Sequence, residues 1–173
     1  NPNVYGIIDV GGASAQIAFL PTDYQVNQKD LHNVRIASSL YPLYSQSYLC
    51  YGTAQILNMY SAKSIRNEGY TTMPILASCY PDGYDFKYTG EDLLGQPCVN
   101  GIMFDSDRPF TLDQNLVDSK STYTISGNSK KNKCRDEVKQ MIPDIECKFG
   151  QGQCGIDGIY QPRSAGNRYL VRI

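Results

Sequence analysis

The chain of 173 residues has the length of one ordinary domain, with 41% hydrophobic and 19% charged residues, a composition that excludes intrinsic disorder. Lys and Arg total 16 against 17 Asp and Glu, so the dense excess of one charge needed by a nucleic-acid arm or a polybasic membrane patch is absent. No apolar run reaches the ~18 residues of a membrane-spanning helix, so none is predicted within these residues.

The first half of the chain predicts strands followed by a helix. Two apolar, β-branched runs over 4–10 and 14–20 flank the turn Gly11-Gly12-Ala13 and read as paired strands. Polar loop is expected over 22–33, and 34–49 is typical of a bent strand or hairpin interrupted at Pro42. From Gly52 the apolar spacing becomes helical and fades near 67–69.

The second half is less regular. Residues 70–133 predict loop with short strands, in which disulfides would substitute for missing core. A second helix is expected from about Lys133, ended or kinked by Pro143, and a short strand is expected over 169–171. The order of these elements favours an α/β or α+β class over a sandwich.

Six cysteines are scattered through the chain without CxxC spacing, and the single histidine leaves few partners for a Cys/His zinc site. A disulfide framework formed in an oxidising compartment is therefore the better interpretation than six reduced core thiols. The spacing alone leaves about 15 complete pairings open.

The segment from Asp9 to Gln16 carries the most chemical information. Adjacent glycines let the backbone approach a ligand with unshielded N–H groups, and a concavity of N–H groups binds phosphate well. A carboxylate at Asp9 would repel that phosphate unless a divalent cation bridges the two. Ser14 and Gln16 lie two apart on the outgoing strand, so they share one face and could orient a water molecule. A plain β-hairpin is the open alternative, since Gly-Gly is a common turn.

Four segments in order resemble the apyrases, the nucleoside triphosphate diphosphohydrolase family. Asp-x-Gly-Gly-Ala-Ser-x-Gln at 9–16 is similar to the family's fourth apyrase conserved region, and Ser-Tyr-Leu-Cys-Tyr-Gly at 47–52 is similar to Ser-Phe-Leu-Cys-Tyr-Gly. Ser-Gly-Asn at 126–128 with Cys134 resembles the Gly-Thr-Gly segment and its following cysteine. Cys154 to Pro162 resembles Cys-x-x-x-Gly-x-Tyr-Gln-Pro, so the likeness covers most of the chain.

This resemblance implies an α/β, ribonuclease H-like (actin-like) fold, of which residues 1–173 would be part of the second domain, with 70–133 a disulfide-stapled, loop-rich region. It implies metal-dependent hydrolysis of the terminal phosphate of nucleoside tri- and diphosphates. Ser14 and Gln16 would align the nucleophilic water, and Asp9 would hold waters of a Ca²⁺ or Mg²⁺ ion. The backbone N–H groups that would hold phosphate belong to Gly11, Gly12 and Ala13.

The family's first phosphate loop and its general-base Glu lie upstream of the matched motif, whereas only eight residues precede Asp9 here. The resemblance therefore implies a piece of a longer enzyme that is inactive alone and whose partners are the nucleotide and a missing N-terminal domain. Any membrane attachment would come through segments outside this sequence. A non-catalytic secreted module of the same fold, binding nucleotide or protein without turnover, is the alternative.

The resemblance also implies three disulfides and a location. The implied pairs are Cys50–Cys98, Cys79–Cys134 and Cys147–Cys154. The implied location is the extracellular face of the plasma membrane, the secreted fraction, or the lumen of the endoplasmic reticulum or Golgi.

Overall fold

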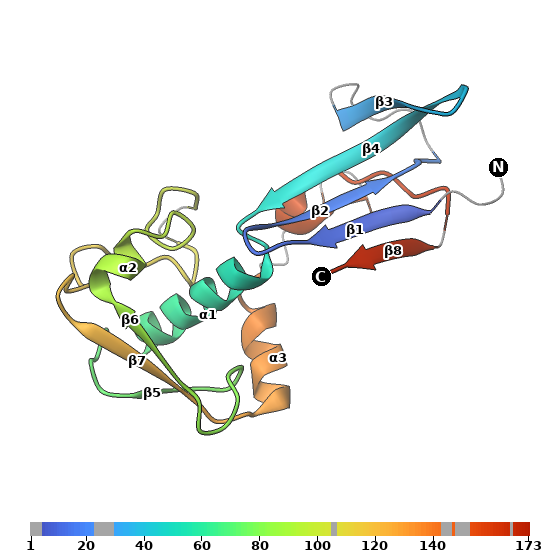
Figure 1. The fold of residues 1–173 in the computed structure, drawn as a ribbon. Coiled ribbons are helices and arrows are strands. Elements are labelled where there is room, and N and C mark those ends of the chain that lie inside the picture. Colours follow the sequence, from blue (N-terminus) through green and yellow to red (C-terminus); the bar gives the residue numbers. More distant parts are fainter. Residues whose placement is uncertain (1–4, 23–29, 105–106, 143–146, 148–152, 167) are drawn as a thin grey trace. The chain divides into compact units, whose positions relative to one another are not determined.

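The computed structural model describes residues 5–22, 30–104, 107–142, 147, 153–166 and 168–173 (Figure 1). The chain divides into two compact units, one formed by 1–54 with 144–173 and the other by 55–143. Helix α1, Thr53–Asn67, contains the boundary in its first turn. Each unit has its own sheet and is described by itself.

The first unit is built on a five-stranded sheet in the order β3-β4-β2-β1-β8. Strands β1 (Gly6–Val10) and β2 (Ser14–Phe19) form the expected antiparallel pair around the glycine turn. Strands β3 (Leu31–Ile36) and β4 (Ser39–Leu49) form a second antiparallel hairpin, and β4 pairs with β2. The expected C-terminal strand is confirmed as β8 (Tyr169–Arg172), which runs parallel to β1 (Figure 1).

Alternation along the strands places the core of this unit on one face of the sheet. Phe19 and Tyr44 face each other across β2 and β4 with ring centroids 5.1 Å apart, and both are buried. Four partly buried residues pack against this pair: Ile17, Leu31, Tyr160 and Tyr169. Because the core occupies one face, the alternate residues of β1, β2 and β4 lie on the other.

The expected interruption at Pro42 is wrong. Strand β4 continues through Pro42, which pairs with Asn33 of β3. Pairing between β4 and β2 extends only as far as Tyr44. At Pro42, β4 therefore pairs with β3 on one side and has no paired strand on the side of β2. On that unpaired side a missing N–H group is tolerated. The hairpin also begins earlier than expected, at Leu31.

The second unit holds α1 from Gln55 onward and a three-stranded sheet in the order β5-β7-β6. The strands are β5 (Ile75–Ala77), β6 (Asp85–Thr89) and β7 (Thr122–Gly127), with short helix α2 (Gly90–Leu94) after β6. The helix expected from about Lys133 is α3, Lys131–Lys139. It already ends at Lys139, so the prediction that Pro143 ends or kinks it is wrong, and Pro143 itself lies outside the described residues. The described residues between α2 and β7 form turns and loop.

The structure contains no free cysteine among its six. Cys79 is bonded to Cys134 within the second unit, and Cys147 to Cys154 within the first, two of the pairs that the resemblance implies. Cys50 and Cys98 are also disulfide-bonded. Their pairing with each other stays a prediction.

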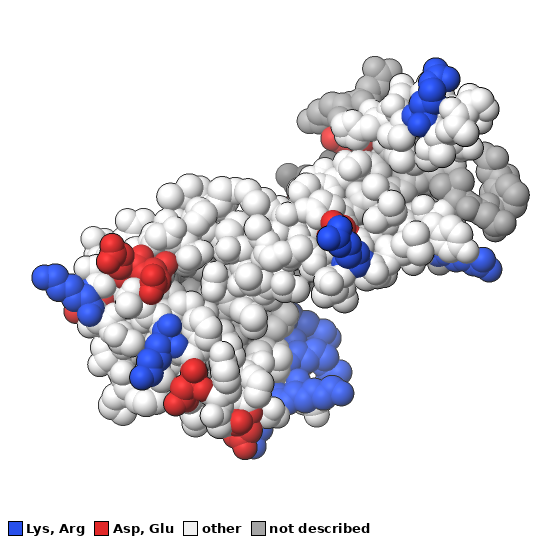
Figure 2. Space-filling view, in the orientation of Figure 1, with Lys and Arg blue, Asp and Glu red and all other residues white. Residues whose placement is uncertain are grey.

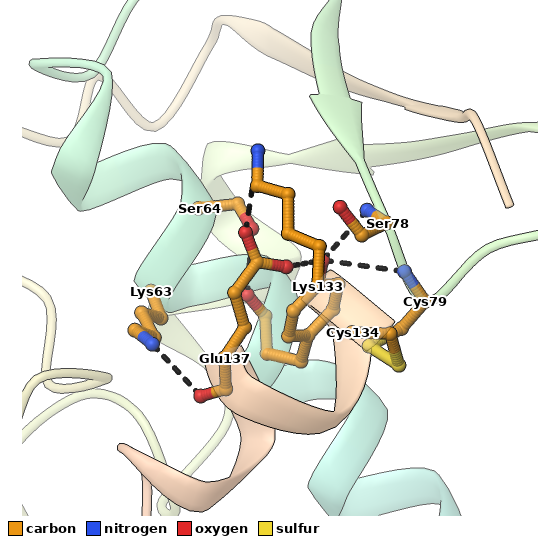
Figure 3. The surroundings of a disulfide bond; sticks show 8 residues. Lys63, Ser64, Ser78, Cys79, Lys133, Cys134 and Glu137 are labelled. Carbon is orange, nitrogen blue, oxygen red and sulfur yellow. Dashed lines mark hydrogen bonds and ion pairs between the residues drawn. A yellow bond between two sulfur atoms is a disulfide. The ribbon is translucent and has the colours of Figure 1, made fainter. Parts of the chain in front are cut away.

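Beside the Cys79–Cys134 bridge, a buried tyrosine links the backbone of Ser78 and Cys79 to helix α3. The hydroxyl of Tyr60 accepts hydrogen bonds from the N–H groups of Ser78 (2.8 Å) and Cys79 (3.3 Å) and donates to Glu137 (2.7 Å). Figure 3 shows Glu137 reaching from the helix between Lys63 and Lys133, and Lys63 Nζ donates to the Glu137 carbonyl at 2.8 Å. Burial, assisted by Glu137, raises the pKa of Tyr60 to about 12. Since an unfolded tyrosine ionises near pH 10, the stability that this group confers decreases as the pH rises through 10 to 12.

Replacing Tyr60 with phenylalanine is expected to lower the free energy of unfolding by about 2 kcal/mol, because the Ser78 N–H group and the Glu137 carboxylate lose their buried partner. Urea unfolding of the 173-residue chain measures the loss. Tyr84→Phe is the matched control, since Tyr84 is half exposed and should lose less than about 0.5 kcal/mol. Equal losses in the two variants would contradict the assigned role of the Tyr60 hydroxyl.

The charged side chains are dispersed in keeping with the near-neutral composition. On the face drawn in Figure 2, acidic and basic side chains stand in small groups amid neutral surface.

Among the described residues, no helix is both long and apolar enough to cross a bilayer. Three basic residues gather at the start of α3, namely Lys130, Lys131 and Lys133.

Candidate functional site

The turn between β1 and β2 is held by the start of helix α1, and all three of its carbonyls are used. The Gly11 carbonyl accepts from the N–H group of Thr53 (2.8 Å), and the Gly12 carbonyl accepts from that of Ala54 (3.1 Å). The Ala13 carbonyl accepts from Cys50 N–H at 2.9 Å. The first N–H groups of a helix have no partner within it, and here they satisfy carbonyls that would otherwise line the turn.

Unlike the carbonyls, the N–H groups of the turn are only partly hydrogen-bonded. Gly11 N–H donates to the Ser14 carbonyl at 3.0 Å and so closes the turn. In the part of the chain that the structure describes, no acceptor bonds to the N–H groups of Gly12 and Ala13, and both residues are exposed. Of the three residues expected to hold phosphate, these two present free donors, while the donor of Gly11 is already committed. Adjacent free N–H groups with no competing carbonyl form a site for an anion.

The two turn glycines are not required for a left-handed backbone. Neither Gly11 nor Gly12 has a positive φ, and an added Cβ would meet its nearest neighbour at 3.6 Å and 3.9 Å, respectively. The glycine whose missing side chain matters for this turn is Gly52. A Cβ there would lie 2.4 Å from the Ser14 nitrogen and 2.5 Å from the Gly11 oxygen. Glycine at position 52 is therefore what allows the helix start to reach the turn.

A row of polar side chains crosses four strands beside this turn. The strand register pairs Asp9 with Gln16 of β2 and with Arg172 of β8, and it pairs Gln16 with Ser47 of β4. Residues in register share a face, so all four side chains lie on the face opposite to the core. Ser14, two residues before Gln16, lies on that face as well. The structure thus brings the expected residues Asp9, Ser14 and Gln16 to one face, at the turn.

Within this row the amide of Gln16 is oriented by two hydroxyl groups. Its Nε2 donates to the Ser14 hydroxyl, and to the Ser47 hydroxyl at 3.4 Å. With Nε2 occupied in this way, Oε1 is the free end of the amide among the described contacts of Gln16. A carbonyl oxygen accepts hydrogen bonds, so the arrangement presents an oriented acceptor for a water molecule.

The carboxylate of Asp9 has a cationic neighbour. Arg172 Nε lies 3.9 Å from Asp9 Oδ1, and the two side chains are 84% and 41% exposed. Among the described residues, no group of three or more His, Cys, Asp or Glu side chains is placed to hold a metal ion. One accessible carboxylate near hydroxyl and amide oxygens fits a hard divalent cation that keeps most of its waters and takes further oxygens from phosphate. It does not fit a cation caged by protein alone.

Sequence reasoning missed two side chains of this row, Ser47 and Arg172. Ser47 belongs to the 47–52 motif, so the motif itself offered a signal, whereas Arg172 becomes visible only through the parallel pairing of β8 with β1. The 47–52 motif also contacts the segment from Cys154 to Pro162, because the Tyr51 hydroxyl donates to the two carboxylate oxygens of Asp157 at 2.8 Å and 2.9 Å. The 47–52 segment therefore contacts both the turn, through Cys50, and the 154–162 segment, through Tyr51.

Comparisons with known proteins identify relatives of this chain. Residues 1–171 match the model of the GDA1/CD39 (nucleoside phosphatase) family. The chain is 31% identical over 162 residues to ectonucleoside triphosphate diphosphohydrolase 2 of Mus musculus, covering 94% of this chain and 29% of that protein. It is 30% identical over 165 residues to ectonucleoside triphosphate diphosphohydrolase 8 of Mus musculus, covering 95% and 31%. The chain thus spans about three tenths of the length of these relatives.

A likeness to a solved structure concerns the fold. The crystal structure of nucleoside triphosphate hydrolases from Neospora caninum matches with a TM-score of 0.51 at 14% identity, over 80% of this chain and 31% of that one. Together with the mixed α/β elements, this likeness bears out the expected α/β, ribonuclease H-like (actin-like) class. With a family model matched over nearly its whole length, the chain belongs to the GDA1/CD39 (nucleoside phosphatase) family.

Proposed function

We propose that this chain is part of the second actin-like domain of an enzyme that hydrolyses the terminal phosphate of nucleoside tri- and diphosphates. The observation that carries the proposal is the hydrogen bonding of the turn. All three of its carbonyls accept hydrogen bonds from residues 50–54, whereas the N–H groups of Gly12 and Ala13 have no acceptor among the described residues. Such a turn favours a phosphate group. The names of the relatives, ectonucleoside triphosphate diphosphohydrolases, support nucleoside phosphates as the substrate class.

In this proposal the two free N–H groups bind the phosphate that is transferred to water, and Gly11 shapes the turn. Ser14 and Gln16 hold the attacking water in line, which contributes through orientation rather than through a charge. Donors aimed at the phosphoryl oxygens stabilise the charge of the transition state without reorganisation. The proton of the water goes to a base outside this chain, so we expect the 173-residue chain to be inactive alone.

Asp9 is the residue of this chain that would hold a Ca²⁺ or Mg²⁺ ion, through water. A divalent cation there would neutralise phosphate charge as a Lewis acid. The proposed partners are the nucleotide and an N-terminal domain of the same protein. The proposed location is the cell surface, the secreted fraction or the endoplasmic reticulum or Golgi lumen. Six cysteines of which none is free and the prefix "ecto" in the relatives' names support it.

The test is phosphate release by the whole protein from ATP, ADP and AMP. We expect release from ATP and ADP in Ca²⁺ or Mg²⁺, loss of release in excess EDTA, and none from AMP, which has no phosphoanhydride bond. The 173-residue chain should release phosphate no faster than buffer. A whole protein that binds ATP without releasing phosphate would overturn the proposal in favour of a non-catalytic binding module.

A further inference from the structure

Phosphate at the turn would face an electrostatic obstacle, because Asp9 carries negative charge on the same face of the sheet. Opposite charge close to the carboxylate offsets that repulsion. The first unit contributes four arginines and no lysine among its described residues, namely Arg35, Arg163, Arg168 and Arg172. Of these, Arg172 is the one whose strand register places it directly beside Asp9.

The contact between these two residues leaves most of the guanidinium available. Its Nε approaches Asp9 Oδ1 to 3.9 Å, a loose ion pair, and the Arg172 side chain is 84% exposed. A guanidinium carries five N–H donors in a fixed fork, so an anion can bind the remaining edge while Nε faces the carboxylate. A loose and exposed ion pair contributes little to the free energy of folding, so a stabilising role does not account for the placement of Arg172 beside Asp9.

We infer that Arg172 is a further anion-binding residue of this site, where it binds the phosphoanhydride part of the substrate from the β8 side. The inference rests on the proposed function, because it takes the turn of Gly12 and Ala13 as the place where phosphate binds. Strand β8 is two strands from β2, with β1 between them. Because neighbouring strands lie about 4.8 Å apart, the long side chain of Arg172 can reach across β1 toward the turn. Arg172 then offsets the Asp9 charge and adds two planar donors that match phosphate oxygens.

The experiment titrates the 173-residue chain with pyrophosphate, the phosphoanhydride without a nucleoside, at low salt. EDTA is present so that the chain's own cations provide the compensating charge. Amide NMR follows the Gly12 and Ala13 signals and yields a dissociation constant for each variant. The variants are Arg172→Ala, Arg172→Lys and, as the matched control for charge, Arg168→Ala, which lies before β8 and contacts the Tyr5 hydroxyl at 3.4 Å.

We expect Arg172→Ala to weaken pyrophosphate binding about tenfold relative to the unaltered chain and to Arg168→Ala. Arg172→Lys should recover part of the loss, because it restores the charge without the fork. Equal affinity in Arg172→Ala and Arg168→Ala, with the Gly12 and Ala13 signals still shifting, would overturn this inference alone. Signals that do not shift in the unaltered chain would overturn the proposed function and this inference with it.

Discussion

Replacing Gln16 with alanine in the whole protein is expected to lower kcat for ATP hydrolysis by about 100-fold. The Ser14 and Ser47 hydroxyls hold Nε2 and leave Oε1 as the end of the amide that orients the attacking water in the proposed mechanism. Loss of one oriented group at a transition state costs on the order of 10² to 10³ in turnover. Because the proposed role of the amide is to orient the water and not to bind the nucleotide, KM should change little.

The matched control for this variant is Gln46→Ala. Gln46 pairs with Ile17 and therefore lies on the opposite face of the same sheet, so its loss should leave kcat within about twofold of normal. Ser14→Ala should resemble Gln16→Ala, and the double variant should lose little more than either one, since both groups orient the same water in the proposed mechanism. Near-normal turnover in Gln16→Ala would show that the amide does not position the attacking water.

The second large effect is expected at Gly52, where alanine should lower the free energy of unfolding of the first unit by about 3 kcal/mol. The added Cβ would lie 2.4 Å from the Ser14 nitrogen and 2.5 Å from the Gly11 oxygen, and these are backbone atoms that cannot move aside as a side chain can. Overpacking of this kind costs about 1 to 3 kcal/mol, with the upper end expected for a rigid neighbour. Urea unfolding monitored by NMR signals of β1 and β2 measures the change in that unit.

Gly12→Ala serves as the control for Gly52→Ala. It adds the same methyl group to the same assembly, but its nearest neighbour, the Ala54 Cβ, lies 3.9 Å away, which is ordinary contact. The free energy of unfolding should therefore stay within about 0.5 kcal/mol of the unaltered chain. A Gly52→Ala chain as stable as Gly12→Ala would mean that the turn and the helix start can separate without loss.

Local patterns in the sequence predicted the elements that local chemistry controls. The runs on either side of Gly11 became β1 and β2, and the change to helical spacing at Gly52 became α1. The prediction at Pro42 is wrong because the cost of a missing N–H group depends on whether a second strand is bonded there. Strand β2 pairs with β4 only as far as Tyr44, and this end point is not encoded near Pro42 in the sequence. The partition into two units likewise has no local signal in the sequence.

The sequence by itself determined which face of β2 carries chemistry, because alternation puts Ser14 and Gln16 on one side whatever the partner strands are. It also carried the four segments that resemble the apyrases. Only the tertiary structure decided which N–H groups of the turn have no acceptor among the described residues, since that depends on Gly11 closing onto Ser14 and on residues 50–54 binding the carbonyls. It likewise decided that Arg172 stands beside Asp9. The reason is that a strand pairing joins residues 163 positions apart, and no spacing along the chain encodes that pairing.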